Sequence, residues 1–311
     1  MTNGRVLVFD VPMRLRFRGQ VRRRGVLLAG RAGWGEFSPF PEYDDRTCAR
    51  WLAAAREAAD DGWPEPVRGV VPVNVTVPAV DPAQAHALVA ASGCRTAKVK
   101  VAEPGQPLSD DIARVEAVRD ALGRDGRVRV DANGAWSVDE AADALKRLDA
   151  FDLEYAEQPV HTLEEMAELR RRVDVRLAAD ESVRTAEDPM RVAGLEAADI
   201  VVLKVQPLGG VRRCLEIAAA CGLPVVVSSA IETSVGLAAG VALAAALPEL
   251  PFACGLGTGQ LLGADVTAEP LLPVDGMLPV RSVAPDPELV HADDETREWW
   301  LQRLARAEAV A

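Results

Sequence analysis

From about residue 70 onward, the chain alternates short apolar runs with segments whose apolar residues recur at helical spacing. The runs rich in valine, alanine and leucine, which we predict to be strands, lie within 70–77, 96–101, 127–133, 153–159, 175–182, 199–205, 224–229 and 252–255. The predicted helices between them are 82–92, 108–122, 137–149, 162–172, 186–195, 209–221 and 233–247. Near-continuous apolar strands joined by helices indicate a parallel sheet that is buried on both faces.

Two architectures share this alternation: a doubly wound open sheet and a closed (β/α) barrel. Eight strands and seven helices in strict order favour the barrel. No G-x-G-x-x-G sequence follows the first strand, which weakens the case for a dinucleotide-binding sheet. The longest apolar run, 235–247, is too short to cross a bilayer and is predicted to be a buried helix.

The residues on either side of this repeat predict a smaller α+β unit. Its expected elements are strands at 5–17, 21–29 and 33–38 and helices at 44–61 and 294–309. We therefore predict an α/β fold with a (β/α)7β TIM-type barrel at 70–268. An α+β capping domain would be formed by 1–69 and by a C-terminal segment, 269–311, that packs back on it.

The net charge limits the kinds of partner that the protein can bind, and the cysteine content indicates the cellular compartment. A formal net charge of −12 argues against nucleic acid or an anionic membrane as a partner, since both need a basic surface. Five cysteines with no C-x-x-C pair argue against a disulfide framework and fit the reducing cytoplasm. The N-terminus lacks the apolar region of a signal peptide. On an acidic protein, the basic run Arg22–Arg24 is expected to be solvated.

Lysine is rare in this chain, with four lysines among 35 lysines and arginines. A codon bias is the simplest explanation. Three of the four, Lys98, Lys100 and Lys204, nevertheless lie inside apolar, strand-like runs. A buried lysine can lose its proton and act as a base, whereas arginine stays protonated. These three lysines are therefore candidates for acid–base chemistry.

Polar and charged residues stand at the ends of successive predicted strands, namely Lys98, Lys100, Asp131, Glu157, Asp180, Lys204 and Ser229. The C-terminal ends of barrel strands meet at one rim, so these side chains are expected to lie together. Charges buried there must pair with one another or hold a metal. Three carboxylates without an imidazole or thiolate cluster suit Mg²⁺, which takes oxygen ligands. A ring of salt bridges that only closes the barrel is the alternative.

A divalent cation beside lysines suits the removal of a proton α to a carboxylate. The metal can take up the negative charge of the enediolate that forms. Burial and the neighbouring cation Lys98 lower the pKa of Lys100, which can then act as a base near neutral pH. Lys204, on the far side of the ring, can act as a second acid or base or as an electrostatic support.

These motifs resemble the enolase superfamily over essentially the whole chain. The matching sequences are G-W-G-E at 33–36, K-V-K at 98–100, D-A-N at 131–133, E-Q-P at 157–159, D-E-S at 180–182 and L-K-V-Q at 203–206. The segments 33–40, 204–211 and 224–258 are most similar to actinobacterial o-succinylbenzoate synthases. That family dehydrates a succinyl-hydroxycyclohexadiene carboxylate to o-succinylbenzoate in menaquinone biosynthesis, so a small-molecule carboxylate is the implied partner.

The same resemblance implies a role for each residue of the site. Lys100 would remove the α-proton and return it to the departing hydroxyl, a syn elimination, while Lys204 stabilises the enediolate and Lys98 lowers the pKa of Lys100. The implied ligands of Mg²⁺, or of Mn²⁺ as its substitute, are Asp131, Glu157 and Asp180. The implied residues at the succinyl end or in support of the ring are Ser228, Ser229, Gly255, Leu256, Arg129 and Asn133.

Two other functions fit part of the pattern. A racemase of N-acylamino acids or a dipeptide epimerase needs an acid or base on each face of the α-carbon, and Lys100 with Lys204 supplies both. The region near the last strand, 254–262, lacks the acidic pair expected to grip the amino group of a dipeptide. A non-catalytic metal-binding barrel predicts that at least one of the charged residues would be missing, and all are present.

The sequence departs from many of these relatives in the connection between its first two strands. The segment 16–24 is too short to form a lid over the substrate. Phe37, Phe40 and the loop 38–45 are the expected cover for the mouth of the barrel instead. The oligomeric state is left open.

Overall fold

The computed structural model describes residues 6–17, 19–184 and 190–311. The N-terminal unit is a three-stranded antiparallel sheet of β1 (Val6–Phe17), β2 (Gln20–Ala29) and β3 (Trp34–Phe37). Helix α1 (Asp45–Arg56) packs on β3 and continues into a π-helical turn, Glu57–Asp61. Asp44 is the N-cap of α1, and its side chain accepts a hydrogen bond from the Thr47 amide at 2.8 Å.

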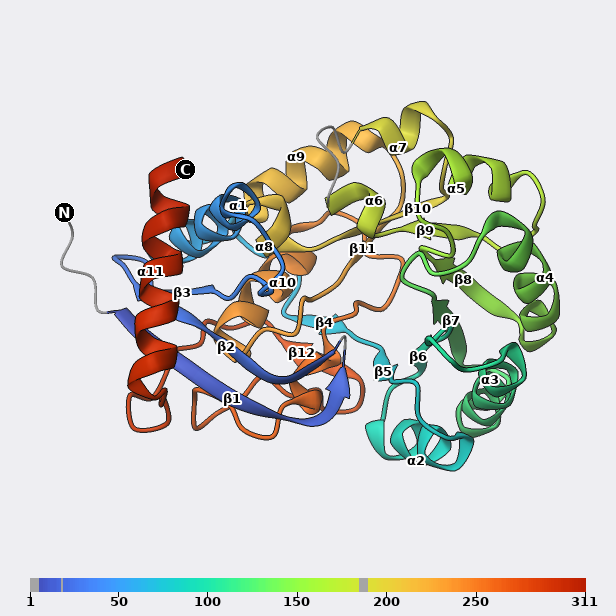
Figure 1. The fold of residues 1–311 in the computed structure, drawn as a ribbon, viewed down its shortest axis with the longest axis horizontal. Helices are drawn as coiled ribbons and strands as arrows, with labels where there is room; N and C mark the ends of the chain where they lie inside the picture. The colour runs from blue at the N-terminus through green and yellow to red at the C-terminus, as the bar shows by residue number, and fades with distance from the viewer. Residues whose placement is uncertain (1–5, 18, 185–189) are drawn as a thin grey trace.

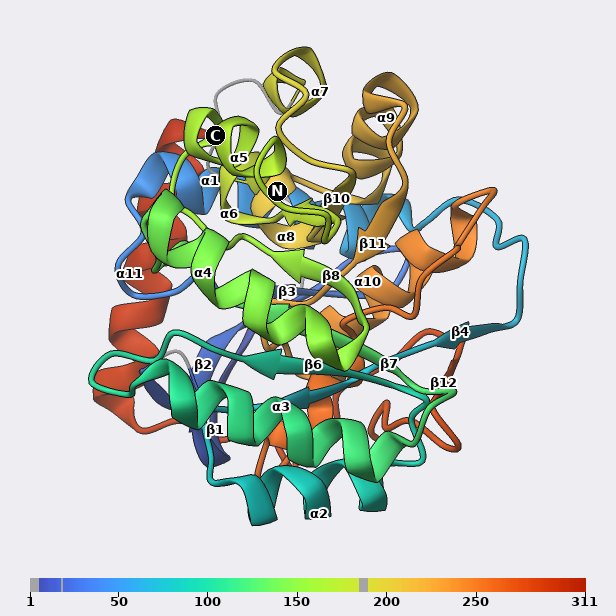
Figure 2. The ribbon, with the colours of Figure 1, turned by 90° about the vertical axis from the view of Figure 1, so that its right-hand side faces the viewer.

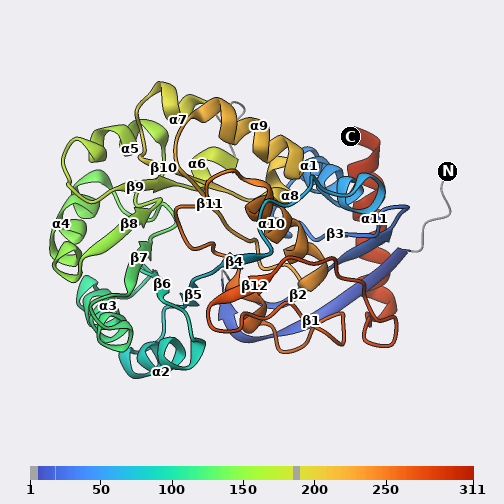
Figure 3. The same cartoon turned by 180° about the vertical axis from the view of Figure 1, so that it is seen from behind.

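The described part of the chain next forms a seven-stranded parallel sheet that curls on itself (Figures 1 and 3). Its strands are β5 (Val75–Val77), β6 (Thr96–Lys100), β7 (Arg127–Asp131), β8 (Leu153–Glu157), β9 (Leu177–Ala179), β10 (Ile200–Leu203) and β11 (Val225–Val227). They are hydrogen-bonded in chain order, which confirms the predicted barrel architecture.

The predicted eighth strand is present only as single bridges between the two edges of this sheet. The Cys254 amide donates to the Pro72 carbonyl at 2.7 Å, and the Gly255 amide donates to the Val227 carbonyl at 2.8 Å. The segment is too irregular to form a ladder, yet it links the first strand region to the last. The barrel is therefore closed by backbone hydrogen bonds.

Helices cover the outer face of the sheet, as α2, α3 and α4 show in Figure 2. They are α2 (Pro82–Ser92), α3 (Leu108–Leu122), α4 (Val138–Leu148), α5 (Leu163–Arg170), α7 (Arg191–Gly194), α9 (Val211–Cys221) and α10 (Ser234–Ala246). Two short helices at strand ends were not predicted, α6 (Glu181–Arg184) and α8 (Val205–Leu208). Most of the predicted helix 186–195 lies outside the described residues, and α7 is the part that is described.

The C-terminal segment contacts both units. Strand β12 (Met277–Pro279) pairs antiparallel with β4 (Val70–Pro72), so the predicted strand 70–77 is in fact two strands with different partners. Helix α11 (Asp294–Val310) lies beside α1, β1 and β2 (Figure 1). The domain boundaries at 69 and 268 stay a prediction.

Helix α10 is buried along its length, as expected for the apolar run 235–247. It contacts β3 of the N-terminal sheet and β11 of the barrel, and so lies at the junction of the two units. Among the described residues, no helix is long and apolar enough to cross a membrane.

The close packing of β3 on α1 depends on Gly35. A methyl group at this position would lie 1.9 Å from the carbonyl oxygen of Ala55, an atom fixed in the helix backbone. We expect Gly35→Ala to lower the free energy of unfolding by about 3 kcal/mol, the upper part of the range for overpacking. Urea denaturation measures this change. Gly69→Ala is the matched control, since no heavy atom lies within 4 Å of its new methyl group; equal stability of the two variants would contradict the prediction.

Candidate active site

The register of the parallel strands brings the predicted charged residues to one end of the barrel. Lys100 pairs with Asp131 across β6 and β7, and Asp131 pairs with Glu157 across β7 and β8. Asp180 and Lys204 follow the last residues of β9 and β10. All but Lys100 are buried, and Lys100 is partly buried, so the ring lies inside the mouth of the barrel.

Within this ring, each lysine contacts a carboxylate. The Lys98 Nζ lies 2.5 Å from Oε1 of Glu157 and 3.1 Å from Oδ2 of Asp131. The Lys100 Nζ lies 2.5 Å from the same Asp131 oxygen, and Lys204 forms an ion pair with Asp180. Lys98 and Lys100 thus share one carboxylate.

The two lysines of β6 differ in their electrostatic environment. Burial disfavours the charge of Lys98, but the carboxylates of Asp131 and Glu157 raise its pKa well above the ordinary value. Burial lowers the pKa of Lys100, and the charge of Lys98 acts in the same direction against the attraction of Asp131. Of this pair, Lys100 therefore holds its proton less tightly than Lys98 does.

The carboxylates have the chemistry of a site for a hard divalent cation. They stand at the ends of β7, β8 and β9, and the second oxygen of Glu157, Oε2, is buried without a hydrogen-bond partner. In the described parts of the chain, no three Asp, Glu, His or Cys side chains stand close enough to hold an ion as they lie. Each carboxylate is instead turned towards an ammonium group, and the all-oxygen donor set fits Mg²⁺.

The ring opens into a small space of about 30 Å³. Of the predicted residues, Ser228, Ser229, Gly255 and Asn133 line it. Asn133 also accepts a hydrogen bond from the Lys100 ammonium at 2.6 Å. Gly255 leaves no room for a side chain, because a methyl group there would lie 2.5 Å from the Ser228 hydroxyl.

Two predicted residues lie away from this space. Arg129 is buried in the barrel interior, where its guanidinium pairs with Glu154 at 2.5 Å and stacks 4.7 Å from the ring centre of Tyr155. Leu256 packs against Gly240 of α10. Neither lines the cavity, so any support that they give to the site is indirect.

Further lining residues were missed from the sequence, namely Phe17, Thr76, Ala230, Ile231 and Thr258. Thr76 has the period-two position of an inward-facing strand residue, which could have been read from the pattern. Phe17 ends β1, and the Lys100 Nζ lies 5.4 Å from its ring centre. Phe37 and Phe40 do not cover the mouth, which corrects the expectation, because they are buried against Trp300 and Trp51.

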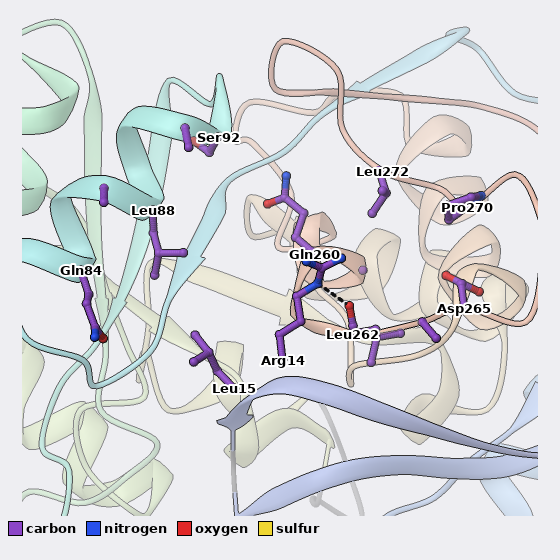
Figure 4. Close-up of a pocket in the computed structure, with 14 residues that line it drawn as sticks. Arg14, Leu15, Gln84, Leu88, Ser92, Gln260, Leu262, Asp265, Pro270 and Leu272 are labelled. Atoms are coloured by element: carbon purple, nitrogen blue, oxygen red, sulfur yellow. Dashed lines mark hydrogen bonds between the residues drawn. The ribbon is translucent and has the colours of Figure 1, made fainter.

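A larger cavity of about 720 Å³ lies between β1, α2 and the segment 259–272 (Figure 4). Arg14 lines it and donates to the neighbouring Leu262 carbonyl at 2.8 Å. Of the described residues that line this cavity, none belongs to the charged ring. Its size therefore does not make it the active-site candidate.

The N-terminal sheet contacts the segment that begins at the cavity-lining residue Ile231 and continues into α10. Glu36 of β3 is buried and accepts hydrogen bonds from the Thr233 amide at 3.1 Å and the Gly236 amide at 3.1 Å, at the start of α10. Arg23 of β2 is also buried, with 2% of its surface exposed, which corrects the expectation of a solvated basic run. Only Arg22 and Arg24 follow that expectation, and both pair with Asp10.

The comparisons with known proteins agree with this fold. The family profile described as "Enolase C-terminal domain-like" matches residues 81–285, and "Enolase N-terminal domain-like" matches 8–59. The solved muconate lactonizing enzyme from Pseudomonas fluorescens has a TM-score of 0.78 at 22% identity, over 96% of this chain and 98% of that one. The L-Ala-D/L-Glu epimerase from Bacillus subtilis also has a TM-score of 0.78 at 22% identity, over 92% and 97% of the two chains, so both show a shared fold.

Closer relatives exist among curated proteins. The o-succinylbenzoate synthase of Thermobifida fusca is 64% identical over 97% of this chain and 95% of its own length. That of Mycolicibacterium smegmatis is 53% identical over 100% of both. The chain therefore belongs to the enolase superfamily and, within it, to the family that contains these o-succinylbenzoate synthases.

Glu36 predicts a pH dependence of stability. Burial, opposed by hydrogen bonds from Thr233 and Ser38, raises the pKa of Glu36 from 4.5 to about 7. Between these values the unfolded chain has released a proton that the folded protein retains, so stability falls as the pH rises from about 4.5 to 7 and is level above that. Each unit of difference between the folded and unfolded pKa corresponds to ~1.4 kcal/mol, so the free energy of unfolding falls by about 3 kcal/mol over this range.

The Glu36→Gln substitution replaces the carboxyl group with an amide, which does not titrate, and so removes this contribution to the pH dependence. We expect urea denaturation at pH 5 and pH 8 to show a smaller decline for this variant than for the wild type. The exposed Glu42→Gln is the control and keeps the wild-type slope. The assignment fails if all three proteins show the same change with pH.

Proposed function

We propose that this chain catalyses the reaction of its close relatives. That reaction is the dehydration of 2-succinyl-6-hydroxy-2,4-cyclohexadiene-1-carboxylate to o-succinylbenzoate, a step of menaquinone biosynthesis, in the cytoplasm. The observation that carries the proposal is the 64% identity over nearly the whole chain. The complete set of three lysines and three carboxylates at one end of the barrel supports it independently.

In the proposed reaction, Lys100 enters as the neutral amine and takes the proton from the carbon that bears the carboxylate. The electron pair left on that carbon forms the new ring double bond as the bond to the neighbouring hydroxyl breaks. The Lys100 ammonium returns its proton to the departing oxygen, which leaves as water. Because one group carries the proton in and out, both bonds break on the same face of the ring.

The other ring residues hold charge and position. The Lys204 ammonium, opposite Lys100, would stabilise the negative charge that spreads over the substrate, and Lys98 would keep the pKa of Lys100 low. Asp131, Glu157 and Asp180 would bind Mg²⁺, or Mn²⁺ as its substitute. A bound metal ion would neutralise the substrate carboxylate as the proton is removed.

The walls of the small space would contact the rest of the substrate. Ser228, Ser229 and Gly255 would line the succinyl end, and Asn133 would hold the Lys100 ammonium. Arg129 and Leu256 would act only through the backbone that they support, since neither lines the cavity. The space measures only about 30 Å³, so it must widen before a substrate can enter.

Removing the base tests the proposal. We expect Lys100→Ala to lower kcat by about 10³-fold, within the range for loss of a general acid–base group, while the fold is retained. The assay follows the ultraviolet absorbance of the diene with purified protein and Mg²⁺. Lys146→Ala is the matched control, because Lys146 is an exposed lysine on α4 and should leave the rate unchanged.

The same assay can overturn the proposal. If the folded wild-type protein does not accelerate loss of the diene, the synthase function is wrong. Lys100 and Lys204 both line the cavity, which is the arrangement that a racemase of N-acylamino acids needs. Loss of optical activity from an N-acyl-L-amino acid would then favour that second function.

Metal removal is expected to abolish activity, because the substrate carboxylate would lose its counter-ion. Chelation followed by gel filtration should leave less than about 1% of the rate, and added Mg²⁺ should restore it. In calorimetric titration, Glu157→Gln should weaken Mg²⁺ binding at least tenfold. The exposed Glu164→Gln is the control and should bind as the wild type does. Full activity without any divalent cation would contradict the prediction.

A further inference from the structure

Ile231 has a backbone conformation that its side chain disfavours. Its φ is +63°, in the left-handed region, and it is the one β-branched residue with a positive φ among the described residues. It is also buried, with 2% of its surface exposed, and it lines the small space beside Lys100 and Ser229. Such strain persists only where the surroundings impose it.

The contacts that impose this conformation come partly from outside the barrel. The Ile231 carbonyl accepts a hydrogen bond from Nε of Arg23 at 2.8 Å. Its amide donates to the Ser229 hydroxyl at 3.3 Å, and the Ala230 amide donates to the Glu232 carboxylate at 2.8 Å. The turn is thus closed on itself by side chains and held from the N-terminal sheet by one guanidinium.

The other end of that guanidinium is fixed as well. Nη2 of Arg23 donates to the carbonyl of Ser38 at 2.8 Å and to its hydroxyl at 3.0 Å. The charged group also stacks on Phe40, with its central carbon 4.7 Å from the ring centre. The planar guanidinium bonds Ile231 and Ser38 at once through two different nitrogen atoms. The single nitrogen of an ammonium group cannot reproduce this bridge.

We propose that Arg23 is a positioning residue for the reaction. Its guanidinium holds the turn Ser229–Ile231 in the strained conformation that places these two side chains against the substrate. The N-terminal sheet thereby shapes the wall of a site whose charged groups all come from the barrel. The expected effect of Arg23 on KM rests on the proposed function. Its expected effect on the structure of the turn does not depend on that function.

The kinetic consequence is a split between KM and kcat. Arg23→Gln should raise KM at least tenfold, because the wall that contacts the succinyl end is no longer fixed. It should change kcat by less than about threefold, since the lysines and carboxylates keep their places. Arg24→Gln is the matched control, because the Arg24 side chain is half exposed and pairs with Asp10. An Arg23→Gln variant with wild-type KM would overturn the proposal.

A backbone rescue separates positioning from a general loss of stability. Glycine adopts a positive φ without strain, so a turn with Ile231→Gly needs less support from Arg23. Arg23→Gln should therefore raise KM by less than about threefold when Ile231→Gly is already present. An equal rise in both backgrounds would show that Arg23 acts on the fold alone and would refute the positioning role.

Hydrogen–deuterium exchange tests the turn without any substrate. The amides of 230–233 should exchange at least tenfold faster in Arg23→Gln than in the wild type, while those of the barrel strands are unchanged. Unchanged exchange at 230–233 refutes the inference, whether or not the wild type has synthase activity. If Arg23→Gln does not fold, Arg23→Lys keeps the charge without the planar guanidinium and is expected to give the same faster exchange.

Discussion

The arrangement of the site depends on the cost of holding six charged groups inside the mouth of a barrel. An isolated buried charge is so unfavourable that it must be paired or neutralised. Here each lysine lies against a carboxylate, and Asp131 serves both Lys98 and Lys100. The two lysines of one strand consequently differ: burial and the adjacent cation act against the proton of Lys100, while two carboxylates hold the proton of Lys98. One electrostatic constraint thus explains both why the charges are paired and why the two lysines of β6 hold their protons differently.

The barrel alone does not complete the site. Helix α10 is buried between the barrel and the N-terminal sheet, and the backbone amides at its start point to the Glu36 carboxylate. Hydrogen bonds from the amides and the helix dipole stabilise a negative charge at a helix N-terminus. Burial of the Glu36 carboxyl group acts in the opposite direction and favours its neutral form. The junction between the two units therefore holds a titratable group against Thr233, two residues after the cavity-lining Ile231.

The charged ring could be predicted from the sequence because two simple regularities locate it. Side chains alternate with period two along a strand, and parallel strands end at one rim, so Lys100, Asp131 and Glu157 had to meet. Apart from Thr76, the residues that form the walls of the cavity could not be located by such a rule. Arg23 is the middle residue of three arginines in one strand, so alternation places it on the opposite face from Arg22 and Arg24 but does not say which face is buried. Leu256 faces α10 because its segment makes single bridges instead of a regular strand, so its direction could not be predicted from alternation.

The walls rather than the ring must decide between elimination and racemisation. Both reactions begin with loss of a proton α to a carboxylate, and Lys100 with Lys204 could serve either. In racemisation the second lysine must deliver a proton to the opposite face, whereas in dehydration it must remain an ammonium while a neighbouring hydroxyl leaves. The position of that hydroxyl relative to Lys100 is set by how the far end of the substrate is held. The turn around Ile231 lines the same cavity as Lys100 and Lys204 and is hydrogen-bonded to Arg23 of the N-terminal sheet, so it is the wall on which we expect that control to depend.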